Sequence, residues 1–423
     1  MFQSVYWYSK KNITPQNPLS SDQSADVAIV GGGLAGLTAA QILSEAGKSV
    51  VILEQAFCGA GASGKNSGFI TPDSEIPLRE LIETKGDAEA RRVWEFVVGG
   101  VHHLRTTIED NSIDCDYQVQ DSLYIAKKKR HIPLIHGEYE ARNKLGYKSK
   151  LYKKNEIPKV LGTDTYYEAV RYPDTFGMNP FMYCQNLKRI LESRQVKIFE
   201  NTPVTHIAPN ELRTEKAAVR AKHIIFCGDR FIPQLGKLNY QIYQAQTFLS
   251  VSKTLSEEQI HMIFPEENML VWDSDLIYHY FRIIEGNRLL VGGSNMFYTY
   301  LPMEKKNNDD IARSHRDYIV KRFPKLDLQM EYVWPGMLGV SQDFLPICGS
   351  DPAVPNTFYI GAASGMPWAA ALGRYTAEKI LSGRDDFDAE FSPYRHFTIH
   401  PWLQKIMGKP AAFAIAHGIK KLL

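Results

Sequence analysis

The chain has 423 residues, of which 44% are hydrophobic and 23% charged, both close to the averages for soluble globular proteins. Its 49 Lys and Arg residues nearly balance its 47 Asp and Glu residues, and a net charge of +2 argues against a general nucleic-acid binder. The sequence holds no apolar run of about 18 residues, which argues against a membrane-spanning helix, and its length predicts two or three domains.

The first regular elements form a β-α-β unit that follows a polar arm at residues 1–24, which we expect to lie on the body. Short β-branched apolar runs predict buried strands, and the segment between them has helical composition and ends at Gly47. In chain order the unit comprises a strand over 26–30, a glycine-rich turn over 31–36, a helix over 37–46 and a strand over 48–53.

The rest of the chain mixes helices with short strands. We expect helices over 78–110, 131–145, 182–193, 309–323 and 368–381, and strands over 117–126, 196–200, 204–207, 221–227 and 357–361. Residues 241–300 contain several strand-like runs and few helix signals. The mixture predicts an α/β fold (α+β overall), in which a mainly antiparallel domain is inserted into an α/β domain.

The glycine-rich turn has the spacing of a dinucleotide-binding site. Gly31 permits the tight turn, Gly33 lets the backbone approach a pyrophosphate, and Gly36 lets the helix pack on the strand. Glu54 ends the second strand, where a carboxylate can accept hydrogen bonds from both ribose hydroxyls and would repel the 2′-phosphate of NADP. A glycine-rich turn in an unrelated α/β protein is the alternative. Here, however, the preceding strand, the spacing of the glycines, the following helix and the acid after the next strand all favour a dinucleotide site.

A second loop of small residues, Gly59–Phe69, follows the acid directly, and a plain NAD domain does not need such a loop. With this loop the sequence resembles the D-amino-acid-oxidase-like FAD oxidoreductases, and is most similar to their gamma-glutamylputrescine-oxidase-like branch. There a GASGRNGG-type loop follows the acid, whereas this chain has GASGKNSG, with Lys65 for the arginine and Ser67 for a glycine.

Five further segments resemble this family in the same order along the chain: residues 203–207, 224–228, 278–293, 334–349 and 361–368. The resemblance implies a Rossmann-like FAD-binding domain and a mainly antiparallel β-sheet substrate domain. It implies FAD contacts by Gly31, Gly33, Leu34, Ala35, Gly36, Glu54, Gln55, Ala62, Ser63, Lys65, Asn66, Ser67, Gly68, Phe69, Val204, Cys227, Gly228, Gly336, Gly365, Met366, Pro367 and Trp368.

The positions of these motifs predict how the two domains share the chain. The FAD-binding domain takes residues 24–112, 176–238 and 333–383, the substrate domain takes residues 113–175 and 239–332, and residues 384–423 form a C-terminal extension.

The resemblance also implies the chemistry, which is oxidation of a C–N bond. A hydride passes from the carbon beside a primary or secondary amine to flavin N5, the imine is hydrolysed, and oxygen reoxidises the flavin with release of hydrogen peroxide. One alternative is a D-amino or imino acid dehydrogenase that donates electrons to a membrane quinone. Another is a flavoprotein subunit without turnover of its own.

Hydride transfer needs a neutral amine in a close, dry pocket more than a strong base, so we expect an aromatic pocket. The period of two along a strand places Tyr278, Tyr280 and Arg282 on one face, and these are the candidate catalytic residues. Core packing of the same side chains is the alternative. Lys65 is a further candidate, either beside the flavin or as a structural lysine.

The resemblance bears on the substrate class as well. In glycine oxidase and its relatives an arginine after the Trp-x-Gly turn holds the substrate carboxylate, and alignment of Gly336 and Asp343 places Leu338 there. This favours an amine substrate, or an acid whose charge another group such as Arg282 holds.

The five cysteines are scattered singly, which disfavours a disulfide framework and a cysteine-rich zinc site. We therefore predict no metal site, free thiols that include Cys58, and a non-covalent FAD. With no signal-peptide order at residues 1–12 we expect a cytoplasmic protein. Residues 401–423 hold four lysines and no acid, so a basic amphipathic helix there could contact the inner face of a membrane or pack on protein. The oligomeric state stays open.

Overall fold

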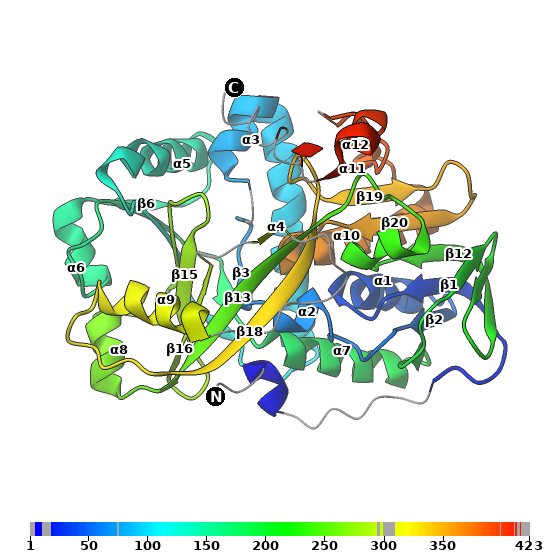
Figure 1. Cartoon of the computed structure of the whole chain (residues 1–423), viewed down its shortest axis with the longest axis horizontal. Coiled ribbons are helices and arrows are strands. Elements are labelled where there is room, and N and C mark those ends of the chain that lie inside the picture. The colour runs from blue at the N-terminus through cyan, green and yellow to red at the C-terminus, as the bar shows by residue number, and fades with distance from the viewer. Residues whose placement is uncertain are drawn as a thin grey trace.

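The structure is a computed structural model that describes residues 5–10, 18–73, 76–293, 297–298, 309–397, 399–409, 411–412 and 415. Figure 1 shows two β-rich halves side by side, with the long strands β13 (Tyr243–Thr254) and β18 (Met330–Val340) crossing between them. The mixed α/β fold that the sequence predicts is confirmed.

Eight described strands form the sheet of the half that contains the N-terminal β-α-β unit. They are β1 (Gln23–Val30), β2 (Val50–Leu53), β9 (Lys197–Phe199), β10 (His206–Ala208), β11 (Glu211–Arg213), β12 (Ala218–Phe226), β19 (Ile347–Ser350) and β20 (Thr357–Gly361). The central pairs β2–β9, β1–β2, β1–β12 and β12–β20 are parallel, while β10, β11 and β19 add antiparallel edges.

Alternation along β1 separates two cores. Val27 and Ile29 pack on one face in the cluster that holds the helices, whereas Ala28 packs on the other face with Leu212 and Ile224. This is why the second half of the strand, Val27–Val30, is apolar: both faces of a parallel sheet are covered there. Helix α1 (Leu34–Glu45) packs against α10 (Met366–Ser382), and α10 packs against α4 (Asp87–Asp110).

Nine described strands form the second sheet. Besides β13 and β18 they are β5 (Ser122–Ile125), β6 (Lys150–Tyr152), β7 (Ala169–Tyr172), β14 (Leu270–Asp273), β15 (His279–Ile284), β16 (Arg288–Gly293) and β17 (Phe297–Tyr298). All neighbouring pairs in it are antiparallel except β5–β14. A small sheet of β3 (Phe69–Ile70), β8 (Phe176–Gly177) and β4 (Gln118–Val119) joins segments near the middle of the molecule.

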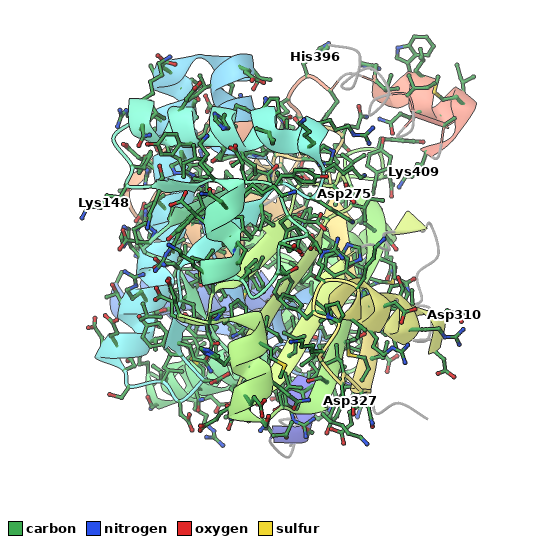
Figure 2. The ribbon with its side chains drawn as sticks, turned by 90° about the vertical axis from the view of Figure 1, so that its left-hand side faces the viewer. Lys148, Asp275, Asp310, Asp327, His396 and Lys409 are labelled. Atoms are coloured by element: carbon green, nitrogen blue, oxygen red, sulfur yellow. The ribbon has the colours of Figure 1, made fainter. Side chains whose placement is uncertain are left out.

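The remaining helices are α2 (Ala62–Lys65), α3 (Leu78–Lys85), α5 (Ile132–Lys144), α6 (Ile157–Val160), α7 (Pro180–Ser193), α8 (Glu257–Ile263), α9 (Asp309–Val320), α11 (Asp388–Phe391) and α12 (Pro401–Met407). Short 3-10 helices lie at η1 (Tyr6–Lys10), η2 (Lys129–His131), η3 (Lys154–Glu156) and η4 (Asp229–Leu235). Figure 2 shows several charged side chains at the outline of the molecule, among them Lys148, Asp310 and Lys409.

Four sequence expectations need correction. The strand expected over 117–126 is two strands, β4 and β5, which belong to different sheets. The helix expected over 78–110 is two helices, because Gly86 takes a φ of +77° between them. The strand expected over 204–207 begins at His206, so Val204 lies in the preceding loop. The region 241–300 contains a helix, α8, whose Ser256 hydroxyl accepts from the Gln259 N–H as an N-cap.

The two sheets draw on the segments that the sequence assigns to the two domains, and the exact domain boundaries stay a prediction. In the C-terminal extension the described residues form α11 and α12. In the basic amphipathic helix expected within residues 401–423, Ala412 is buried and Ile415 is exposed. Residues 416–423 lie outside the described part of the chain.

Candidate FAD and substrate site

The glycine-rich turn joins β1 to α1 against the end of β12. Gly31 has a φ of +107°, and a Cβ there would lie 2.7 Å from the carbonyl oxygen of Cys227. A Cβ on Gly36 would lie 2.1 Å from the carbonyl oxygen of Gly31, so a larger residue could not keep α1 against the turn. The turn therefore requires glycine at position 31 for its backbone conformation and at position 36 for the close packing of α1, as the sequence indicates.

Glu54 lies at the carboxyl end of β2, directly beside this turn. Its carboxylate accepts hydrogen bonds from the backbone N–H of Gly32 at 2.7 Å and of Ala56 at 2.8 Å. Burial raises the pKa of the Glu54 carboxyl, and these two backbone donors oppose that shift. The side chain lines a large cavity and retains acceptor capacity for hydroxyl donors.

This large cavity, of about 980 Å³, adjoins a smaller one of about 260 Å³, with which it shares lining residues. Both are lined by the beginning of α1, by α2, by β18, and by α10 with the loop before it, through Leu34, Ala62, Ser63, Lys65, Met337, Ala363 and Ala369. The turn and Glu54 line the large cavity, and aromatic side chains line the small one. A long cavity with a glycine-rich turn at one end and apolar walls at the other fits an extended dinucleotide with a flat ring.

The N-terminus of α10 lies at the small cavity and is brought there by glycines. Gly365 caps the helix with a φ of +101°, and Gly365, Met366 and Pro367 line the cavity. A Cβ on Gly100 of α4 would lie 2.0 Å from the carbonyl oxygen of Pro367, so this helix pair approaches closely only with glycine there. The partial positive charge of a helix N-terminus suits an electron-rich ring edge.

Most of the residues that the resemblance assigns to FAD line one of the two cavities. The exceptions are Gly36 and Gly68, which support the loops, and Trp368, whose ring packs on Phe96 and Phe391 at 6.0 and 5.7 Å. Their roles as FAD contacts stay predictions. The structure adds several lining residues that the sequence analysis did not name, including Phe248, Met337 and Ser364.

Aromatic side chains form part of the wall of the small cavity. The rings of Tyr278 and Tyr280 lie 5.8 Å apart, and Phe69 contacts Tyr280 at 5.5 Å and Trp272 at 6.5 Å. All four line the cavity, as does Leu338. The pocket is therefore aromatic, as expected for a site that keeps water away from a reacting amine.

Arg282 lies behind the second loop and not in the described lining of the cavity. It is fully buried, and it donates to the carbonyl oxygens of Ser67 at 3.1 Å and Met178 at 2.7 Å. Burial lowers the pKa of its guanidinium to about 10, against the opposing charge of Asp116. The arrangement gives Arg282 a supporting role, and the predicted contact with a substrate carboxylate finds no support in it.

Asp73 is a lining residue that the sequence analysis missed. Its carboxylate accepts from the Arg142 guanidinium at 2.7 and 2.8 Å and from the Thr71 hydroxyl at 3.1 Å. The same guanidinium binds buried Glu138 at 3.0 Å. The sequence signal that could have identified it is an acidic residue in the segment 71–73, directly after the loop of small residues at 59–69. Asp73 and Lys65 are the two charged residues in the described lining of the small cavity.

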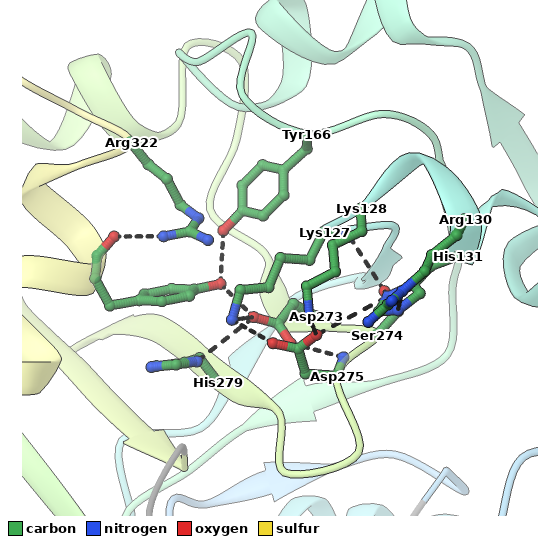
Figure 3. Close-up of polar contacts among 11 residues, drawn as sticks. Lys127, Lys128, Arg130, His131, Tyr166, Asp273, Ser274, Asp275, His279 and Arg322 are labelled. Atoms are coloured by element: carbon green, nitrogen blue, oxygen red, sulfur yellow. Dashed lines mark hydrogen bonds and ion pairs between the residues drawn. The ribbon is translucent and has the colours of Figure 1, made fainter.

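A polar network around Asp273 and Asp275 lies at the turn between β14 and β15 (Figure 3). Leu276 and Ile277 of the same turn line the cavity and are exposed. Asp275 pairs with Lys127 and Lys128, and Asp273 accepts from the Tyr318 hydroxyl at 2.7 Å. Although burial opposes it, hydrogen bonding from His279 and the charge of Lys127 lower the pKa of Asp273.

All five cysteines lie in described segments and are free. Among the residues that the structure describes, no group of three His, Cys, Asp or Glu side chains is placed to hold a metal ion. In the same part of the chain no helix combines the length and the apolar character needed to cross a membrane.

Comparison with known proteins agrees with this geometry. A family model described as "DAO: FAD dependent oxidoreductase" matches residues 26–379. A probable oxidoreductase, OrdL, of Haemophilus influenzae is 27% identical over 391 residues, covering 89% of this chain and 88% of the relative. Gamma-glutamylputrescine oxidoreductase of Escherichia coli is 27% identical over 406 residues, covering 93% and 92%. Glycine oxidase from Geobacillus kaustophilus has a similar structure, with a TM-score of 0.77 at 18% identity, covering 89% of this chain and all of that one.

Proposed function

This chain belongs to the family of FAD-dependent oxidoreductases (DAO), which act on amines or amino acids, and from that premise we propose that it oxidises the C–N bond of a primary or secondary amine. FAD is its cofactor, and when bound it accepts a hydride from the carbon beside the substrate nitrogen. The imine product is then hydrolysed by water.

We propose an amine substrate because of the side chains that form the cavity wall. Its described lining combines aromatic and aliphatic side chains with two charged residues, Lys65 and Asp73, and contains no arginine. Leu338 lines this wall, and alignment with glycine oxidase puts it at the position of the arginine that would bind a carboxylate. An α-amino acid would leave its carboxylate without a bidentate partner, whereas a neutral amine fits this wall.

The residues of the wall would orient the amine and keep it dry. Tyr278 and Tyr280 each present a ring and a hydroxyl that can accept from or donate to a substrate nitrogen. Phe69 and Trp272 restrict water at the reacting carbon. We assign Tyr278 and Tyr280 to substrate orientation, and no side chain of the wall needs to act as a strong base.

We propose oxygen as the electron acceptor, with release of hydrogen peroxide. Lys65 lines both cavities, and a cation at their junction would stabilise the negative charge of reduced oxygen. The second candidate is a D-amino or imino acid dehydrogenase that passes electrons to a membrane quinone. It is favoured by α12, which exposes Trp402 and Ile406 beside Lys405, a combination that suits an anionic membrane surface.

An anaerobic screen of the purified yellow protein tests the reaction. Primary and secondary amines should bleach the flavin absorbance, and α-amino acids should do so more slowly. Admission of air should restore the colour and release one hydrogen peroxide per amine. Bleaching that only a quinone or dye reverses would support the dehydrogenase. Bleaching by no amine or amino acid would contradict both and leave a flavoprotein without turnover of its own.

We further propose that the FAD is not covalently attached. Cys58 packs beneath the glycine-rich turn, where its sulfur would lie 2.6 Å from a Cβ on Gly32, and it lines neither cavity. Burial raises the pKa of its thiol well above the usual value. Acid precipitation should therefore release all of the yellow colour, and colour retained in the pellet would contradict this proposal.

A further inference from the structure

The N-terminal arm packs on the outside of the loop that follows Glu54. Its helix η1 appears in blue beside α7 and the lower ends of β13 and β18 (Figure 1). Trp7 is fully buried there, in a cluster with Phe181, Tyr332 and Trp334. The rings of Trp7 and Trp334 meet edge to face at 6.3 Å. Val5, Tyr6 and Trp7 of the arm thus belong to the packed interior although they precede the first sheet strand.

Distant side chains bind the outward carbonyl oxygens of this loop. The indole N–H of Trp7 donates to the carbonyl of Asn66 at 2.8 Å, and that of Trp334 donates to the carbonyl of Lys65 at 2.9 Å. In the same way the Tyr8 hydroxyl binds Ala60 at 3.1 Å, and Arg282 binds Ser67. These donors come from the arm, from β18 and from β15, so three separate segments fix one loop.

The side chain of Asn66 completes the arrangement from within the loop. Its amide donates to the carbonyls of Ala62 and Ser63 at 3.0 and 2.8 Å, and its oxygen accepts from the N–H of Gly68 at 2.8 Å. These bonds shape the turn, but they do not fix where it lies relative to the cavity. That position depends on the bonds from outside.

The carbonyls of Lys65 and Asn66, which the two indoles bind, belong to a stretch of backbone whose residues line the cavity. A trans peptide unit is planar and its C=O and N–H point in opposite directions. Because the carbonyl of Asn66 accepts from the indole of Trp7, the N–H of Ser67 in the same peptide unit points away from that indole, and residues 65–67 line the cavity. The backbone of Lys65, the cation at the junction of the two cavities, is held by the same bonds.

We infer that Trp7 and Trp334 are positioning residues of the FAD site, which hold the backbone of residues 65–67 against the cofactor, so that the N-terminal arm is part of that site. Docking of the arm and binding of FAD must then stabilise each other, since coupling between two binding events is reciprocal. This inference rests on FAD binding and not on the identity of the substrate.

Titration of apoprotein with FAD tests the inference with two matched variants. Trp7→Phe keeps an aromatic ring but removes the donor to Asn66, and it should raise the FAD dissociation constant about five- to tenfold. Tyr6→Phe also removes a donor from the arm, but that donor binds the carbonyl of Glu285 at 3.1 Å, away from the loop. Tyr6→Phe should change the constant less than about twofold. Equal constants for Trp7→Phe and the unchanged protein would overturn the inference.

A second measurement compares the loaded protein with the apoprotein, first unchanged and then as a variant, and separates a positioning role from simple packing. Amide hydrogen exchange of residues 5–10 should be slower in the FAD-loaded protein than in the apoprotein. Trp334→Phe should reduce that difference, because the same loop then transmits less stabilisation to the arm. Exchange that is identical with and without FAD would show that the arm packs independently of the cofactor and would overturn the inference.

Discussion

The carboxylate of Glu54 accepts a hydrogen bond from the backbone N–H of Gly32 at 2.7 Å. The acid at the end of the second strand is thereby bonded to the glycine-rich turn after the first. Its other oxygen binds the N–H of Ala56, so the same side chain also holds the start of the chain that leads to the second loop. Glu54 supports the architecture of the site and faces the cavity as well.

Glu54→Gln is expected to weaken FAD binding at least about tenfold. A carboxamide offers one oxygen to two N–H groups, so either Gly32 or Ala56 would face its NH₂, which leaves a buried donor without an acceptor. Titration of apoprotein followed by flavin fluorescence measures the effect. Glu45→Gln, at the exposed end of α1, is the control and should bind as the unchanged protein does.

Lys188→Met is expected to lower the free energy of unfolding by about 3–5 kcal/mol. Lys188 forms a buried ion pair with Glu200 at 2.8 Å, and Glu200 also accepts from the Cys58 N–H at 2.7 Å. Removal of the cation leaves a buried carboxylate without its partner. Urea denaturation of the apoprotein measures the loss.

Two further variants test that explanation. The double variant Lys188→Met/Glu200→Gln should recover most of the stability, because no uncompensated charge remains. Lys197→Met removes an exposed lysine from the adjoining strand and should cost less than about 1 kcal/mol. A double variant no more stable than Lys188→Met would contradict the electrostatic origin.

His315 should make the protein less stable in mild acid. Burial lowers the pKa of its imidazole to about 4, and its ring nitrogens lie 2.8 Å from the Ser250 hydroxyl and 3.1 Å from the Gly293 carbonyl oxygen. The unfolded chain takes up this proton near pH 6.5, before the folded one does. Stability is therefore complete above about pH 6.5 and falls as the pH drops toward 4, by about 3 kcal/mol in all.

His315→Gln should flatten this dependence, because an amide can bind the same partners and does not titrate. Unfolding free energies measured at intervals between pH 7 and 4 give the comparison. His206→Gln, at an exposed position, should keep the slope of the unchanged protein. A slope unaffected by His315→Gln would assign the acid sensitivity to other groups.

Leu338→Arg should convert the cavity wall into a carboxylate site. A guanidinium there can form two parallel hydrogen bonds to a carboxylate, so acetate should perturb the flavin spectrum at concentrations at least about tenfold lower. α-Amino acids should also bleach the flavin faster than before. Leu338→Met is the matched control and should leave acetate binding unchanged. If Leu338→Arg binds acetate no better, Leu338 does not face the substrate.

Sequence patterns alone were enough to predict the family and the glycine-rich turn at one end of the cavity. The β-α-β unit, its three glycines and Glu54 lie within 31 residues of one another, and local spacing is enough to specify a turn whose neighbours are near in the chain. The order of the later motifs likewise predicted an α/β fold with a second, mainly antiparallel sheet. The aromatic pair Tyr278 and Tyr280 could be proposed because alternation along a strand is also local.

Which distant side chains meet at the candidate site depends on how the chain folds and could not be predicted from local patterns. The period of two grouped Arg282 with the two tyrosines, but its length and burial carry its guanidinium to the carbonyls of Ser67 and Met178. Nothing in the arm predicts that Trp7 would bind Asn66, 59 residues later, because such a bond depends on how three segments pack together. A backbone turn is specified by its own few residues, whereas a buried donor finds its acceptor only when the whole core has formed.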